Sequence, residues 1–206
     1  CDIGVNFTDK RLFFEPVFER ALAVDVSHII ITGTNLDKSQ QAIQLAQQYP
    51  SHLWTTAGVH PHDASQFTPQ TIDDLRTLAK SSRVVAIGEC GLDFNRNFST
   101  PEQQCFAFEQ QLKLACELGL PVFLHERDAF EVQIEYLTKY RNDLHGGVVH
   151  CFTGDIKQME RYLDLGLYIG ITGWVCDLKR GQALRGAIKS LPLERILLET
   201  DSPYLR

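Results

Sequence analysis

The residues best able to do chemistry in this 206-residue chain are imidazoles and carboxylates that end short apolar runs. Five runs end in such groups, which are His60 and His62, Glu89, His125, His150, and Asp201. Imidazole and carboxylate are both good ligands for divalent cations once deprotonated, so their convergence would form a metal site. A bound cation polarises a substrate oxygen and lowers the pKa of water. The set therefore predicts a metal-dependent hydrolase.

The other three histidines, His28, His52 and His145, come before apolar runs and not after them. We expect them at the opposite rim of the fold. A lone histidine more often has a hydrogen-bonded structural role, because histidine is commonly half-buried. It is the gathering of four histidines and two carboxylates at run ends that favours a functional interpretation.

Eight apolar runs alternate with helical patterns, and their ends fall about 24 to 36 residues apart. Runs such as Ile29–Ile31 and Val84–Ile87 are nearly continuous and β-branched, which is typical of parallel strands covered on both faces. Eight evenly spaced units predict an α/β fold of the (β/α)8 TIM-barrel type. An open, doubly wound parallel sheet shares the same alternation and remains the alternative.

Helix boundaries are marked by local signals. Thr100-Pro101 with Gln103 predicts a capped helix that ends near Gly119, while Asp155 and Thr68 open two others. No linker or low-complexity tract interrupts the pattern, so we expect one domain over residues 1–206. Because only residues 202–206 follow the last strand, we expect the final C-terminal helical segment of the barrel to be lacking.

Composition excludes several classes of protein. Hydrophobic residues make up 44% and charged residues 22%, which supports a full core. No apolar run reaches the roughly 18 residues of a membrane helix, and no signal peptide is visible at Cys1. Six cysteines without a C-x-x-C pair fit reduced thiols in a cytoplasmic protein. The net charge of -6 argues against a broad basic face for nucleic acid, although a few phosphates could still be bound locally.

Motifs spread over the whole chain resemble the TatD family of metal-dependent deoxyribonucleases. The matching segments include residues 2–6, 32–35, 57–62, 87–93, 95–98, 150–154, 170–176 and 199–204. The resemblance implies a TIM-type barrel of the amidohydrolase-like superfamily. It also implies a Mg2+-dependent 3′–5′ exonuclease that degrades single-stranded DNA, and RNA as well, in DNA repair or nucleic-acid turnover.

The resemblance also assigns roles to the residues at the run ends. It makes Glu89, His125 and His150 metal ligands, and Asp201 either a ligand or the acceptor of the proton of the attacking water. It places His60 and His62 at the scissile phosphate, although His60 could instead orient a ligand.

The roles of Arg127 and Glu199 are predicted from their side-chain chemistry and position, and not from the resemblance. The Arg127 guanidinium could clamp a phosphate oxygen, or it could pair with Glu126 or Asp128 and only brace its loop. We interpret Glu199 as a core residue or as a partner of a metal ligand. Four aromatic residues in loops after strands could stack on bases or simply pack, namely Phe94, Phe98, Trp174 and Tyr204.

The first strand departs from the broader family, in which an HxH pair contributes two metal ligands. Here those positions are Gly4 and Asn6. We therefore expect one tight metal site, with Mg2+ favoured over Mn2+ or Zn2+ because fewer imidazoles suit a harder ion.

Two other functions remain open at this point. A related barrel could hydrolyse an ester or amide such as a D-aminoacyl-tRNA, since the same metal chemistry serves both. A barrel that only binds partners is the second alternative. For the nuclease, we expect single-stranded DNA or RNA as the substrate, no membrane association, and a monomer.

Overall fold

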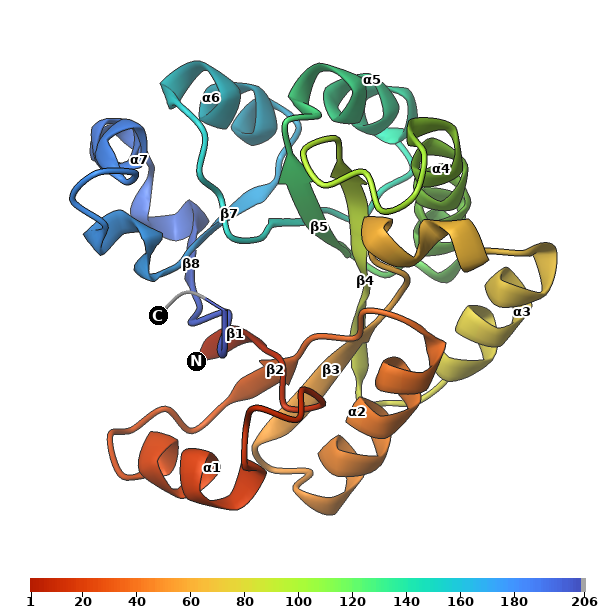
Figure 1. The fold of residues 1–206 in the computed structure, drawn as a ribbon, viewed down its shortest axis with the longest axis vertical. Coiled ribbons are helices and arrows are strands. Elements are labelled where there is room, and N and C mark those ends of the chain that lie inside the picture. Colours follow the sequence, from red (N-terminus) through yellow and green to blue (C-terminus); the bar gives the residue numbers. More distant parts are fainter. Residues whose placement is uncertain (205–206) are drawn as a thin grey trace.

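Eight parallel strands form the centre of the structure, a computed structural model in which residues 1–204 are described (Figure 1). Each strand pairs with its neighbours in chain order, from β1 to β8. The strands are β1 Asp2–Val5, β2 Ile29–Ile31, β3 Leu53–Ala57, β4 Val84–Asp93, β5 Val122–Arg127, β6 Gly147–Val149, β7 Tyr168–Ile171 and β8 Ile196–Leu198. A doubly wound sheet reverses its strand order partway, so the open-sheet alternative is wrong and the barrel is confirmed.

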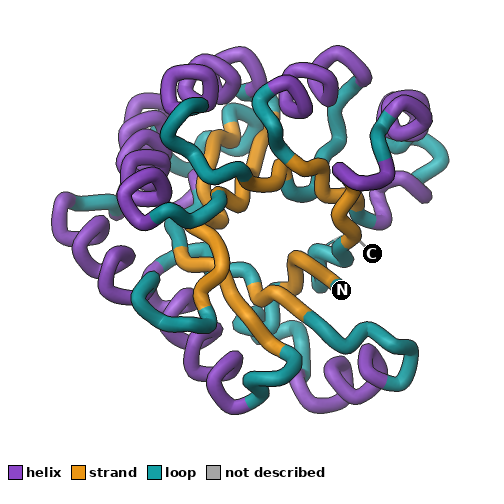
Figure 2. Tube along the Cα trace, turned by 180° about the vertical axis from the view of Figure 1, so that it is seen from behind, coloured by secondary structure: helices purple, strands orange, loops and turns teal. Residues whose placement is uncertain are grey.

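The ring closes where β8 meets β1. Val5 and Ser202 form a parallel bridge just beyond β8, and the Asp201 N–H donates to the Gly4 carbonyl at 2.9 Å. Figures 1 and 2 both show β1 and β8 side by side. The eight strands thus form a nearly closed barrel.

Helices cover the outside of this ring (Figure 2). They are α1 Phe14–Leu22, α2 Leu36–Gln48, α3 Pro69–Leu78, α4 Pro101–Leu118, α5 Phe130–Tyr140, α6 Ile156–Asp164 and α7 Gln182–Ala187. Short 3-10 turns complete the connections, namely η1 Pro61–Gln66, η2 Gly173–Cys176, η3 Ile188–Ser190 and η4 Leu193–Arg195. No helix among residues 1–204 is both long and apolar enough to cross a membrane.

The predicted helix boundaries are confirmed. The Thr100 hydroxyl accepts from the Gln103 N–H at 3.4 Å, and Gly119 ends α4 with a left-handed φ of 64°. Asp155 caps α6 by accepting from the Gln158 N–H at 3.0 Å. Each signal lies within a few residues of the end it marks, which is why the sequence alone locates it.

Two layers of apolar side chains hold the barrel in place. The larger layer lies between strands and helices and includes Phe108, Leu112 and Tyr162. A smaller group fills the barrel interior, where the Phe123 ring of β5 lies so close to β1 that a Cβ on Gly4 would be 3.5 Å from it. That ring also stacks on His150, with centroids 4.8 Å apart. The interior is therefore plugged directly beneath the polar residues of one end.

Candidate active site

The predicted functional residues converge at the carboxyl end of the barrel. A pocket of about 550 Å³ there is lined by residues at, or shortly after, the carboxyl ends of all eight strands. Every residue predicted to have a catalytic, metal-ligating or substrate-binding role lines it, namely His60, His62, Glu89, His125, Arg127, His150 and Asp201. In a parallel barrel, the loops after the strands meet at this end, so residues far apart in the sequence become neighbours.

Glu89 lies at the centre of this cluster and is 6% exposed. Its Oε1 atom is 3.0 Å from His125 Nδ1, 3.2 Å from His150 Nε2 and 3.3 Å from a His60 ring nitrogen, Nε2. Without a metal, the carboxylate oxygen could satisfy these nitrogens only if each carried a proton. A divalent cation satisfies the carboxylate and the imidazoles together. The donor set therefore fits a metal ion.

Two further carboxylates contact the ring nitrogens of His150 and His125 that do not face Glu89. His150 Nδ1 is 2.9 Å from Glu199 Oε2, and His125 Nε2 is 3.4 Å from Asp93 Oδ2. Because Glu199 accepts a hydrogen bond from the Nδ1–H of His150, the Nε2 atom beside Glu89 is the one left to bind a cation. A carboxylate behind an imidazole fixes the ring and makes it a better ligand. Glu199 is thus a partner of His150, which agrees with one of its two predicted roles.

His60 belongs to the cluster in a different way. Its ring, Glu89 and His125 offer ligand atoms that all lie within 4.8 Å of one another. However, His60 Nδ1 accepts from the His62 N–H at 3.1 Å, so a neutral ring carries its proton on Nε2. That nitrogen faces Glu89 as a donor. The hydrogen bonds therefore favour His60 as an N–H donor over a metal ligand.

Gly4 lies in β1, and a buried carboxylate fills the space beside it. A Cβ on Gly4 would lie 2.5 Å from Glu199 Oε2, and a Cβ on Gly170 would also collide with the Glu199 carboxylate. The two glycines leave just enough space for this buried group. In this chain, the carboxylate that supports His150 occupies the space that a β1 side chain would need.

Asn6, the other departure in the first strand, holds Asp201. Its Nδ2 group donates to Asp201 Oδ1 at 3.1 Å and to the Ser202 carbonyl at 3.2 Å. Asp201 also has a φ of 51°, which few residues other than glycine adopt readily. The neutral amide therefore orients the carboxylate of Asp201.

Burial and mutual charge shift the pKa values of the cluster. Burial would raise the pKa of Glu89, but His60, His150 and the hydrogen bond from His125 outweigh it and hold that pKa well below its usual range. Burial would likewise lower the pKa of His125, yet hydrogen bonds with Asp93 and Glu89 raise it to about 9. The carboxylates in this way stabilise positive charge at the site, which is what a cation supplies.

Asp201 and His60 shift in the opposite sense. Burial, reinforced by Glu89 and Glu199, raises the pKa of Asp201 to about 6 despite the opposing charge of His150. Burial lowers the pKa of His60 to about 4, even though Glu89 lies beside it. Asp201 is therefore poised to exchange a proton near neutrality, while His60 is a neutral donor.

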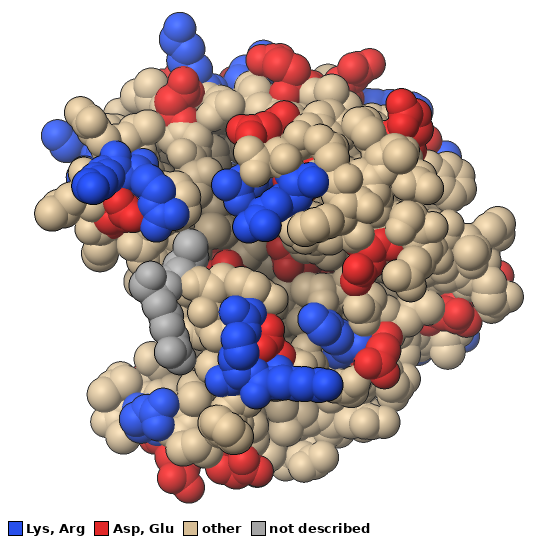
Figure 3. All heavy atoms as spheres, in the orientation of Figure 1, with Lys and Arg blue, Asp and Glu red and all other residues tan. Residues whose placement is uncertain are grey.

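Basic side chains surround this acidic and imidazole centre. Four basic residues line the pocket from separate parts of the chain, namely Lys38 in α2, Arg96 after β4, Arg127 at the end of β5 and Arg180 before α7. Figure 3 shows Lys and Arg gathered around the central hollow. Within residues 1–204, no carboxylate lies within 4.0 Å of the Arg127 guanidinium, so the alternative pairing with Glu126 or Asp128 is not observed. The chain carries a net charge of -6 yet presents local positive charge where phosphates would enter.

The sequence interpretation gave no role to Asp93, which is 1% exposed in the structure. Its Oδ2 atom is 2.8 Å from His62 Nε2, and its Oδ1 atom accepts from the Arg96 N–H at 2.8 Å. The sequence predicts that this strand ends near Glu89, but β4 continues to Asp93 by pairing with β5. In that longer strand Glu89 and Asp93 are four residues apart and face the same way. Residues 90–93 were not recognised as part of the strand, because they follow the apolar run and resemble a loop.

A nearly closed (β/α)8 barrel with histidines and carboxylates at its carboxyl end defines a hydrolase barrel of the metal-dependent, amidohydrolase type. The comparisons with known proteins agree with this class. The chain belongs to the TatD related DNase family, whose family model matches residues 1–206.

Curated relatives are identical to this chain at about half of the aligned positions. It is 52% identical over 206 residues to the 3′-5′ ssDNA/RNA exonuclease TatD of Salmonella typhimurium, covering 99% of this chain and 79% of that protein. It is 54% identical to the protein of the same name from Erwinia tasmaniensis, covering 99% of this chain and 80% of that protein.

Solved structures share the fold. A TatD family hydrolase from Entamoeba histolytica superposes with a TM-score of 0.87 at 33% identity, covering 98% of this chain and 73% of that one. A TatD homologue from Escherichia coli gives a TM-score of 0.86 at 31% identity, covering 98% of this chain and 79% of that one.

Proposed function

We propose that this protein is a metal-dependent 3′–5′ exonuclease that hydrolyses single-stranded DNA and RNA. The observation that carries the proposal is the approach of three imidazoles to one buried carboxylate oxygen of Glu89, inside a pocket rimmed by basic side chains. The names of the curated relatives supply the substrate class and the direction of degradation. A role in DNA repair or nucleic-acid turnover follows from that substrate class.

For the metal, we propose one tight site made by Glu89, His125, His150 and Asp201, with Mg2+ as the ion in use and Mn2+ or Zn2+ as substitutes. A divalent cation there supplies charge to a phosphate oxygen and lowers the pKa of a nearby water. Oxygen ligands from two carboxylates suit Mg2+, because hard cations prefer oxygen. Gly4 contributes no ligand, and Asn6 is already bonded to Asp201.

The chain's own groups then move the proton and hold the phosphate. Asp201, oriented by Asn6, accepts the proton of the attacking water. The His62 ring stabilises the charge that grows on the phosphate and helps the 3′ oxygen to leave. His60, whose N–H faces Glu89, orients that ligand, which is the alternative role the sequence left open for it. Asp93 holds His62 in place from behind. Arg127 clamps a phosphate oxygen, since its guanidinium is free of carboxylate partners among the described residues.

We also propose that the protein is a cytoplasmic monomer without membrane association. All six cysteines are free, which supports a reducing compartment. Size-exclusion chromatography with light scattering would test the monomer, and a dimer mass at micromolar concentration would overturn it.

The decisive test is a gel assay with 5′-labelled single- and double-stranded oligonucleotides, with added Mg2+ and with EDTA. We expect a ladder of single-stranded products that shorten from the 3′ end, dependent on the metal and absent with EDTA. Hydrolysis that persists in EDTA, or release of D-amino acid from a D-aminoacyl-tRNA in place of nucleotides, would overturn the proposal. Restoration of the stripped protein by Zn2+ alone would overturn the choice of Mg2+.

A further inference from the structure

A second pocket, of about 600 Å³, lies beside the candidate active site and has no role in the function proposed above. We call it the side pocket and define it by Phe94, Asn95, Asp128, Phe130, Thr153 and Trp174. Thr153 and Trp174 also line the active-site pocket, as do Glu126 and Arg127. The two pockets therefore share a wall, and a ligand that fills one can extend into the other.

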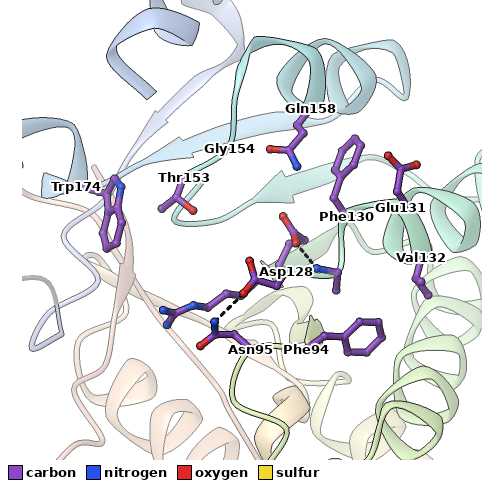
Figure 4. A pocket seen from close by; sticks show the side chains of 13 residues that line it. Phe94, Asn95, Asp128, Phe130, Glu131, Val132, Thr153, Gly154, Gln158 and Trp174 are labelled. Carbon is purple, nitrogen blue, oxygen red and sulfur yellow. Dashed lines mark hydrogen bonds between the residues drawn. The ribbon is translucent and has the colours of Figure 1, made fainter. Parts of the chain in front are cut away.

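The walls of the side pocket suit a nucleoside. In Figure 4, the rings of Phe94 and Phe130 lie on one side, with Thr153 and Trp174 on the other. Aromatic faces stack on any base without regard to sequence. The volume also lies within the roughly 300–1,000 Å³ typical of small-ligand sites.

Hydrogen bonds between loops hold the side pocket open. The Phe94 N–H donates to the Arg127 carbonyl at 2.9 Å, which continues the pairing of β4 with β5. Beyond it, Asn95 Nδ2 donates to Asp128 Oδ2 at 2.7 Å, as the dashed line in Figure 4 shows. Glu126 Oε1 accepts from the Ala129 N–H at 2.8 Å at the floor of the pocket. A site fixed in this way needs little reordering when a ligand binds.

Burial distinguishes the two pockets. The active-site pocket is lined by buried residues such as Asn6, Glu89 and His150, whereas the side pocket is lined by exposed residues such as Asn95 and Asp128. A strand shortened from its 3′ end has one nucleotide beyond the scissile phosphate, and all the others must leave towards solvent. The enclosed pocket suits the terminal nucleotide, and the exposed one suits the nucleotide before it.

We propose that the side pocket binds the penultimate nucleotide, on the 5′ side of the scissile phosphate, with its base against Phe94 and Phe130. This inference rests on the proposed exonuclease function. It places Arg127 in the wall between two nucleotides, beside the phosphate that joins them. It also makes the enzyme sensitive to the presence of a penultimate base without selecting which base it is.

The first test uses the wild-type protein and three single-stranded oligonucleotides, one intact and two with an abasic site at either the 3′-terminal or the penultimate position. The measured quantity is kcat/KM for release of the first nucleotide. We expect the penultimate abasic site to lower kcat/KM on the order of ten-fold, the loss expected for one base-aromatic stack. An unchanged kcat/KM for that oligonucleotide, or a loss confined to the terminal abasic site, overturns the inference.

The second test couples the base to the pocket. Phe94→Leu keeps apolar volume against the core but removes the aromatic face, so we expect it to lower kcat/KM on the intact oligonucleotide, mainly through KM. On the penultimate abasic oligonucleotide the same variant should lose less than about two-fold, because the contact is already gone. Equal losses on both substrates overturn the inference. Phe130→Leu repeats the cycle if Phe94→Leu does not fold.

The matched control is Phe13→Leu, because Phe13 is 75% exposed and lines neither pocket. It should leave both substrates unaffected, and a loss equal to that of Phe94→Leu would show that the effect is not local and overturn the inference. The proposed function fails in a different way, by absence of metal-dependent nucleotide release from the intact oligonucleotide.

Discussion

The two ends of the barrel carry the same kind of side chain in different surroundings. At the carboxyl end, His60, His62, His125 and His150 each lie within 4.0 Å of at least one buried carboxylate. At the amino end, where the sequence predicted them, His28, His52 and His145 precede β2, β3 and β6. No such carboxylate contact involves these three within the described part of the chain. His52 instead bonds the Ser27 carbonyl at 2.8 Å, and His28 stacks on Trp54.

The backbone differs between the two ends as well. Among residues 1–204, four of the five non-glycine residues with positive φ lie in loops that follow strands, namely Asn97, Asp128, Cys151 and Asp201. Backbone strain of this kind tends to gather at functional sites, where the surrounding contacts hold it. The comparison teaches that histidine by itself indicates nothing. Its position after a strand, and the carboxylates it meets there, separate a chemical role from a structural one.

The largest expected effect comes from breaking the cluster at its centre. Glu89→Ala removes the oxygen on which three imidazoles converge. We expect nuclease kcat/KM to fall at least about 1000-fold, because metal assistance supplies several kcal/mol of barrier reduction. Circular dichroism should show an intact fold, and Glu160→Gln on the exposed face of α6 is the matched control. Near-normal rates in Glu89→Ala would contradict the assignment.

The next effect concerns pH in protein stripped of metal. The pKa of Asp201 is raised from 3.8 to about 6 in the fold, so the folded chain binds this proton more tightly than the unfolded chain. The resulting stability is complete below about pH 4 and is lost as pH rises through about 6, on the order of 2–3 kcal/mol in all. In Asp201→Asn, the asparagine can adopt the positive φ of this position, and it has no carboxylate to ionise, so the loss of stability at rising pH disappears. In urea unfolding with EDTA, the free energy of unfolding of the variant should rise relative to that of wild type as the pH increases from 4 to 7.5. A difference in free energy that does not change with pH would refute the prediction.

A smaller effect tests the carboxylate behind the cluster. Glu199 accepts from His150 Nδ1 at 2.9 Å and from the Cys151 N–H at 2.5 Å, using both oxygens. Glu199→Gln offers only one acceptor oxygen, so one of these donors faces an amide N–H instead. We expect metal affinity to fall roughly 10–100-fold, as measured by titration of stripped protein. Unchanged affinity would mean that Glu199 serves packing alone.

The smallest effect on activity belongs to the amino end. His52→Ala removes the bond to the Ser27 carbonyl and a ring contact with Phe18. The free energy of unfolding should fall by about 1 kcal/mol, while nuclease kcat/KM stays within about two-fold of wild type. Denaturant melts and the gel assay measure the two quantities side by side. A large loss of activity in this variant would erase the distinction between the two ends.

Much of the fold could be predicted from local signals. The apolar runs gave eight strands, and caps such as Thr100 and Asp155 located helix ends, because each depends on residues within one turn. The expected segment beyond the last strand stays a prediction, as residues 205–206 lie outside the described part. The sequence also predicted that these imidazoles and carboxylates lie together, since the carboxyl ends of the strands meet at one end of any parallel barrel.

The details of the site depended on contacts between distant segments. Asp93 was missed because β4 is extended by pairing with β5, a contact that no local pattern encodes. The donor role of His60 follows from the His62 N–H. The crowding at Gly4 comes from the Glu199 carboxylate, at the other end of the chain, which would have to move to admit a side chain there.

By itself, the sequence determined the number of strands, the ends at which imidazoles and carboxylates gather, and the family. Periodicity, caps and motifs are local properties of the chain. Only the tertiary structure decided which nitrogen faces which oxygen, that the Glu199 carboxylate fills the space beside Gly4, and that a second pocket opens beside the first. These depend on side chains packed across the barrel, where a few tenths of an ångström separate a ligand from a clash.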